Sequence, residues 1–278
     1  MRSAHTAAVL AAFACLGGCL LTSDFDGVAG ERPQDSGASS VDGGGSGSSD
    51  GAAGADGAAP EGDAEAGTEA GASPCTGTHV FCTDFDQTSA LPVPGWSSSS
   101  TQGSLALDAA QPVSAPSSLR AKVQGTGTSN AYLFRNVFIT SYVALSLAFD
   151  FRVNDCAGQG TNAITFAYLG LAADVAYGFV LLSSGELAVG AQVSGTATFF
   201  NLTTPIAKGA WRHAVMAVRT KSPTLAHLTM TVDGASSVDT DAPSGATSQT
   251  VLLNIGANGS GAPKGCDVSF DNVVLDKE

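Results

Sequence analysis

Alternation of apolar and polar residues is the dominant pattern between residues 75 and 278 of the chain. In the run 145–153, leucine, phenylalanine and valine occupy every second position, with serine, alanine, aspartate and arginine between them. Such alternation places one face of a strand on a core and the other toward solvent. Comparable runs cover 118–124, 132–138, 163–169, 175–182, 186–192, 211–219, 227–232, 251–256 and 266–276.

Turn-forming residues separate these runs, and no helical stripe competes with them. Clusters of Gly, Ser, Asn and Pro lie between the runs, and Asp233-Gly234 is the sharpest hairpin signal. The number of short strands predicts an all-β fold, a two-sheet antiparallel sandwich.

The first nineteen residues indicate export. An apolar run follows Arg2 and ends at Leu16-Gly17-Gly18-Cys19. The run is too short to span a bilayer, which needs about 20 apolar residues, so it is typical of a signal peptide. The four last residues resemble the lipobox of bacterial lipoproteins, which implies lipid attachment at Cys19 and cleavage after Gly18. An ordinary secretory signal that happens to end in cysteine is the alternative.

The residue after the cysteine is Leu20, which is not acidic. By the same resemblance, this favours delivery to the outer membrane of a Gram-negative bacterium. We therefore expect a lipid-anchored protein on the periplasmic or extracellular face of that membrane. The expected domains are a signal peptide at 1–18, a lipidated linker at 19–74 and the β-sandwich at 75–278.

The linker is rich in Gly, Ala, Ser and Asp, and we expect it to be disordered because it offers little apolar surface to bury. Residues 24–74 hold eleven of the 25 acidic residues of the chain against one basic residue, Arg32. The net charge of −13 is therefore mostly a property of this spacer. No basic patch is present to neutralise phosphates, so nucleic acid is not an expected partner.

Four cysteines remain after the signal segment: Cys75, Cys82, Cys156 and Cys266. An even number in an exported domain predicts two disulfides, with three connectivities open. We favour Cys75–Cys82, which closes a short loop, and Cys156–Cys266, which joins the end of one strand to the start of the last. The spacing of a zinc site, C-x₂-C, is absent.

Several segments together resemble the concanavalin A-like jelly roll, in particular its laminin-G-like branch. They are Phe81–Asp86, Ala115–Ala121, Trp211–Val215, Leu228–Gly234 and Phe270–Leu275. The resemblance covers 75–278 and implies a jelly-roll sandwich of a kind that binds carbohydrate. It also places Asp271 where many relatives hold a structural calcium ion, for which one carboxylate and backbone oxygens can suffice. An aspartate that closes a hairpin or pairs with an arginine is the alternative.

The family's catalytic motifs are missing. Glucan hydrolases of this fold use a Glu-x-Asp-x-x-Glu strand, but the domain has only Glu186 and Glu278, and the Gln-x-His strand of alginate lyases is absent too. We therefore predict a non-catalytic domain, not an enzyme, that binds a glycan or a cell-surface protein. A structural envelope protein and a glycan-active hydrolase or lyase are the alternatives.

Four residues are the candidate ligand contacts. Asp150 and Arg152 share one face of an otherwise apolar strand, and Tyr168 or Tyr177 is the candidate stacking platform for a sugar. An ion pair on a solvated face is the other interpretation of Asp150 and Arg152, and Trp211 is expected in the core.

Overall fold

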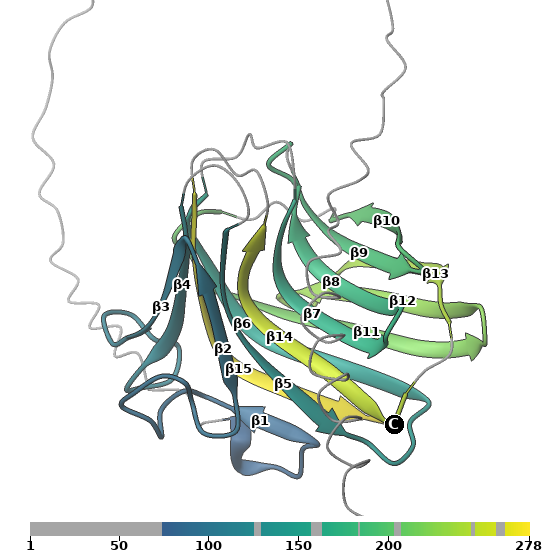
Figure 1. The fold of residues 1–278 in the computed structure, drawn as a ribbon, viewed down its shortest axis with the longest axis horizontal. Helices are drawn as coiled ribbons and strands as arrows, with labels where there is room; N and C mark the ends of the chain where they lie inside the picture. Colours follow the sequence, from purple (N-terminus) through teal and green to yellow (C-terminus); the bar gives the residue numbers. More distant parts are fainter. Residues whose placement is uncertain are drawn as a thin grey trace, which may run out of the picture. The chain divides into compact units, whose positions relative to one another are not determined.

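The computed structural model describes residues 74–124, 129–156, 163–182, 184–202, 207–245, 248–259 and 265–278. Over these residues the chain forms two antiparallel β-sheets packed as a sandwich, and its one helical element is the 3₁₀ turn Pro74–Thr76 (Figure 1). The expected fold class is confirmed. No helix in the described part is long and apolar enough to cross a membrane. The predicted signal peptide, Cys19 and the linker up to residue 73 lie outside the described residues.

The first sheet, which we call the charged sheet, has the strand order β13-β12-β11-β6-β15-β4-β3. The eighth strand, β1, pairs with the second half of β15, next to the stretch where β4 pairs with its first half. The strands are β1 (Phe81–Thr83), β3 (Gly103–Asp108), β4 (Ser118–Val123), β6 (Ala144–Cys156), β11 (Arg212–Ser222), β12 (Leu225–Val232), β13 (Ala235–Pro243) and β15 (Cys266–Lys277).

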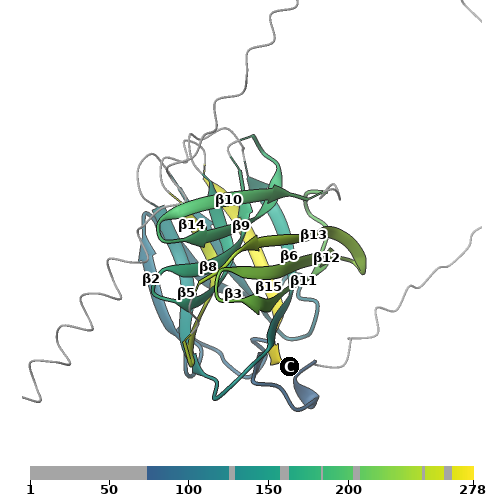
Figure 2. The same cartoon turned by 90° about the vertical axis from the view of Figure 1, so that its right-hand side faces the viewer.

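The second sheet, which we call the neutral sheet, has the order β10-β9-β8-β7-β14-β5-β2. Its strands are β2 (Ser97–Thr101), β5 (Ser129–Phe138), β7 (Ile164–Ala172), β8 (Val175–Leu181), β9 (Leu187–Val193), β10 (Thr196–Asn201) and β14 (Thr250–Gly259). In Figure 2, β9 and β10 lie above β12 and β13, where the edges of the two sheets come into contact.

Aromatic rings hold the two sheets together. Phe149 and Phe151 of β6 meet Phe179 of β8 across the interface, with ring centroids 5.7 Å and 4.9 Å apart. Phe166 and Phe270 complete this cluster from β7 and β15. All five side chains are at most 1% exposed, and truncating one such ring to alanine costs about 3–5 kcal/mol.

Every run of alternation named above forms a strand, and the hairpin at Asp233-Gly234 is confirmed. Both residues have positive φ angles, 52° and 78°, as a two-residue hairpin turn requires. Four further strands were not predicted: β2, β3, β10 and β13. They lie at the sheet edges, where few side chains are buried and the apolar alternation is weak.

Both favoured disulfides are confirmed. Cys75 and Cys82 are bonded across seven residues, and Cys156 and Cys266 across 110 residues. The second pair sits directly opposite in the register of β6 and β15.

Candidate functional site

Tyr168 and Asn254 stand next to each other on the outer face of the neutral sheet. They are register partners on β7 and β14, the two central strands of Figure 1. The sequence neighbours of both residues belong to the core between the sheets. Because side chains alternate between the two faces of a strand, Tyr168 and Asn254 point outward. Directly opposed residues of an antiparallel pair have Cβ atoms about 4.5–5.5 Å apart.

Small residues extend from this pair toward one edge of the sheet. One line of register partners crosses all seven strands: Phe199, Gly190, Gly178, Tyr168, Asn254, Phe134 and Ser97. The neighbouring line runs through Gln192, Ala176, Gly170, Leu252 and Asn136. We call these outward residues the neutral face. Glycine and alanine at its centre let a ligand approach the backbone of β8 and β9 closely.

The Tyr168 hydroxyl and the Asn254 amide form no hydrogen bond within the described part of the chain, although Asn254 is only 5% exposed. Burial raises the pKa of Tyr168 to about 12, so the hydroxyl is protonated at neutral pH. A β-carbon placed on Gly170 would lie 2.9 Å from Cε1 of Tyr168, which means that the ring lies over this glycine. Polar groups without partners on an apolar face indicate a place for a ligand.

Register shifts surround the pair. On β7 they fall between Thr165 and Ala167 and between Gly170 and Ala172, and β14 carries another between Ile255 and Asn258. Bulges of this kind redirect side chains and are frequent beside active sites.

The charged sheet carries a different polar cluster. Asp150 of β6 accepts hydrogen bonds from Nδ1 of His213 at 2.7 Å and from Nδ2 of Asn272 at 2.7 Å. The hydrogen bond to Asp150 raises the pKa of His213 above its usual value, against the opposing effect of burial. Asp150 is therefore satisfied by its own neighbours.

Arg152 is also held by the protein. Its guanidinium lies 5.1 Å from the centre of the Trp211 ring and donates to the side chain of Gln111. Trp211 donates from Nε1 to the carbonyl of Gln111 at 2.8 Å, is only partly buried and does not belong to the hydrophobic core, so the prediction that it is a core residue is wrong.

The four predicted ligand contacts do not form one site. Asp150 and Arg152 belong to the charged sheet, whereas Tyr168 and Tyr177 belong to the neutral sheet. Tyr177 is fully buried in the core and donates to the carbonyl of Pro243 at 2.9 Å. As a sugar platform Tyr177 is a wrong prediction, because its strand turns it inward. Tyr168 alone reaches the outer face of the neutral sheet.

The donor set around Asp271 does not fit a calcium ion. One carboxylate oxygen accepts from the amides of Val113 and Ser114 at 2.9 and 3.0 Å. The other accepts from the Ser114 hydroxyl and the Asn272 amide at 3.2 and 2.9 Å. N–H and O–H donors occupy the lone pairs that a cation would need. In the described part of the chain, no three His, Cys, Asp or Glu residues gather as metal ligands.

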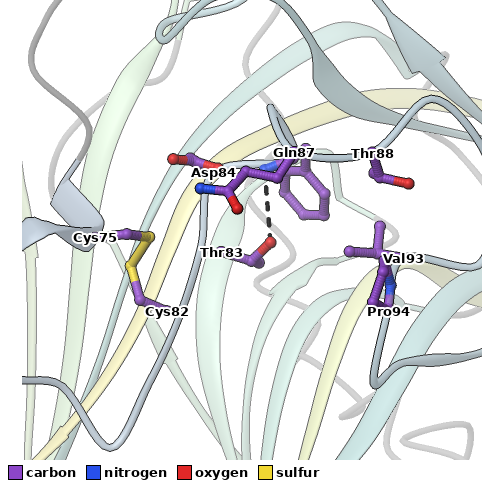
Figure 3. A pocket seen from close by; sticks show the side chains of 9 residues that line it. Cys75, Cys82, Thr83, Asp84, Gln87, Thr88, Val93 and Pro94 are labelled. Atoms are coloured by element: carbon purple, nitrogen blue, oxygen red, sulfur yellow. Dashed lines mark hydrogen bonds between the residues drawn. A yellow bond between two sulfur atoms is a disulfide. The ribbon is translucent and has the colours of Figure 1, made fainter.

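A small pocket lies beside the Cys75–Cys82 disulfide (Figure 3). Its volume is about 270 Å³, and Thr83, Asp84 and Gln87 contribute polar side chains to its wall. Ligand pockets usually measure about 300–1,000 Å³, so this pocket lies at the small end of that range.

Sequence reasoning missed Asn254. Its signal was present, since one amide interrupts the apolar run 251–255, but only the register shows that it faces Tyr168.

Comparison with solved structures finds the same β-sandwich fold in other proteins. No family model and no curated protein matches the chain. Among solved structures, endo-β-1,4-glucuronan lyase from the fungus Trichoderma reesei has a TM-score of 0.53 at 15% identity, covering 72% of this chain and 96% of that one. The marine PL-14 alginate lyase from Aplysia kurodai has a TM-score of 0.52 at 12% identity, covering 73% and 100%. The carbohydrate-binding module CBM66 from Bacillus subtilis has a TM-score of 0.40 at 16% identity, covering 66% and 96%.

These neighbours contradict the prediction of a non-catalytic domain that is not an enzyme, because the glucuronan lyase and the PL-14 alginate lyase, with TM-scores of 0.53 and 0.52, are enzymes. That prediction was based on the absence of the glutamate and Gln-x-His motifs from the sequence. The physical reason for the error is that elimination requires no carboxylate pair. A hydroxyl that moves a proton and a donor to a carboxyl group are enough.

Proposed function

We propose that the domain is a polysaccharide lyase that cleaves a uronate-containing glycan on the neutral face. The observation that carries the proposal is the Tyr168–Asn254 pair: a hydroxyl and an amide, opposed in register and without partners among the described residues, beside the small residues Gly178, Gly170 and Ala176 of the neutral face. The names of the structural neighbours, a glucuronan lyase and an alginate lyase, support the substrate class.

The chemistry is a β-elimination. A base removes the proton on C5 of a uronyl residue, the C4–O bond breaks, a C4=C5 double bond forms, and the departing oxygen takes up a proton. When both events occur on one side of the sugar ring, a single tyrosine phenolate can accept the first proton, and the phenol so formed can return it to the departing oxygen. Tyr168 has this role in the proposal, and the Asn254 amide donates to the carboxyl group as negative charge develops there.

The decisive comparison uses two tyrosines on neighbouring strands. We expect Tyr168→Phe to abolish formation of the unsaturated product, measured by its ultraviolet absorbance, with the melting temperature nearly unchanged because the hydroxyl has no partner. Tyr177→Phe is the matched control: it should lower stability by about 1 kcal/mol through loss of the bond to Pro243 and leave the rate unchanged.

A pH profile gives the second measurement. Because the pKa of Tyr168 is about 12, its phenolate fraction rises about tenfold per pH unit below that value. We expect kcat/KM to rise between pH 7 and pH 10 in the wild-type protein. Full activity of Tyr168→Phe, or a rate that falls over this range, would refute the role of Tyr168.

We further propose that a lipid on Cys19 anchors the lyase in the outer membrane and that residues 19–74 act as its spacer. The sequence Leu16-Gly17-Gly18-Cys19 and the acidic, glycine-rich composition of the spacer support this. An anchored lyase would act on a polymer at the cell surface, so the partners are a membrane and a glycan.

A further inference from the structure

Charge is divided unequally between the two sheets. Within the strand bounds, Arg135 is the only Asp, Glu, Lys, Arg or His residue of the neutral sheet. Arg135 is the register partner of Leu253, a core residue, and lies over the ring of Phe81 at 4.7 Å. It therefore points away from the outer face, which carries only hydroxyls, amides and apolar groups. All the other charged strand residues belong to the charged sheet, for example Arg120, which pairs with Asp108 and Asp267.

This distribution is unfavourable for a polyuronate with free carboxylates. Such a polymer carries one negative charge per sugar, and each carboxylate placed on a partly buried, uncharged face loses hydration without gaining a cation. The basic side chains of the charged sheet offer no substitute, since several are engaged in ion pairs there.

We propose that the substrate of the neutral face is a polyuronate whose carboxyl groups are esterified. This inference rests on the proposed lyase function and narrows its substrate class. An ester has no charge to desolvate, and its carbonyl makes the C5 proton more acidic than a carboxylate does. The Asn254 amide N–H then donates to the ester carbonyl oxygen, where the negative charge of the intermediate collects.

The reaction balances without any further reactant. The C5–H and C4–O bonds break, the C4=C5 bond forms, and the proton passes through Tyr168 to the departing oxygen. The ester stays intact and appears in the product as a methyl uronate at the unsaturated end.

The experiment measures the preference between two forms of one polymer. Homogalacturonan and alginate are each supplied as the free acid and as the methyl ester, and kcat/KM is determined from the unsaturated product. We expect a kcat/KM at least about tenfold higher on the ester than on the acid. Affinity electrophoresis measures the same preference in binding alone. The Tyr168→Phe variant, which should not cleave the polymers, is run through gels containing each of them, and its retardation is compared.

Introducing a cation should weaken the preference for the ester. Asn254→Arg places a guanidinium beside Tyr168, and Asn254→Gln is its neutral control. Because Asn254 is buried, Asn136→Arg with the control Asn136→Gln is the second pair, at an exposed position of the same face. Each arginine variant should lower the ester-to-acid ratio of kcat/KM by about tenfold relative to its glutamine control.

The failure of this inference is distinguishable from the failure of the lyase proposal. Equal or faster cleavage of the free acid, or equal binding of both forms, would overturn the ester preference and leave the lyase intact. No unsaturated product from any of the four polymers would overturn the lyase function, and with it the inference.

Discussion

At the scale of single residues, three histidines, two in the charged sheet and one just before β1, each bind an aspartate. His79 binds Asp276 at 2.9 Å, His213 binds Asp150 at 2.7 Å, and His227 binds Asp241 at 3.1 Å. The aspartate partner raises the pKa of both His79 and His213. Because each imidazole is committed to a carboxylate, we assign these residues to stability and not to catalysis.

The pH dependence of stability follows from His213. Its folded pKa is raised above 6.5, so the stabilisation from its charged form is complete below pH 6.5 and is lost as pH rises through the folded pKa. We expect the difference in free energy of unfolding between the wild type and His213→Gln to be largest near pH 6 and to shrink toward pH 8. Urea unfolding across this range measures it, and a difference that grows with pH would contradict the assignment.

Tyr168 and Tyr177 show that the local sequence does not reveal which face of a sheet a side chain occupies. Tyr168 and Tyr177 are both flanked by apolar residues, and sequence reasoning treated them as equivalent candidates. Strand alternation and the register shifts of β7 put one hydroxyl on the neutral face and the other in the core. No local feature of the sequence distinguishes them, because orientation depends on which face of each strand meets the opposite sheet.

At the scale of elements, the central strands were predictable and the edges were not. β6 and β15 are long and apolar on their inner face, so alternation identifies them. β2 consists of serine and threonine alone and becomes a strand only because its backbone pairs with β5. A pairing of this kind leaves no hydrophobic signal in the sequence.

The long disulfide stabilises the pairing of β6 with β15. Cys156–Cys266 closes 110 residues, whereas Cys75–Cys82 closes seven. The chain-entropy model gives about 4.7 kcal/mol for a loop of about 100 residues and less for a short one. We expect the double serine variant at 156 and 266 to lose about 2–5 kcal/mol of unfolding free energy in urea.

The double serine variant at 75 and 82 is the comparison for that experiment. It should lose less, because its loop is far shorter. An equal loss for both double variants would show that strand pairing, and not loop closure, dominates the effect.

At the scale of the whole molecule, the division of charge between the sheets is the feature with the widest consequences. It leaves the charged sheet with internal ion pairs and the neutral sheet with an uncharged outer face. The net charge of the chain conceals this, because the spacer supplies much of it.

The anchor is also a property of the whole chain. We expect Cys19→Ser to move the protein from the detergent-soluble membrane fraction to the aqueous fraction. The lyase rate should be unchanged, because the proposed site is built from residues of the sandwich. Fractionation and mass measurement of the N-terminal peptide test this. An unmodified Cys19 in the mature protein would contradict the anchor.

The sequence by itself determined the sandwich class, the central strands, the hairpin at Asp233-Gly234 and the number of disulfides, since alternation, turn chemistry and cysteine number are local or countable. Only the tertiary structure decided that Tyr168 meets Asn254, that Tyr177 is buried, and that Asp150 and Arg152 belong to the other sheet. Register and sheet assignment join residues far apart in the chain. Those pairings follow from how the two sheets pack as a whole.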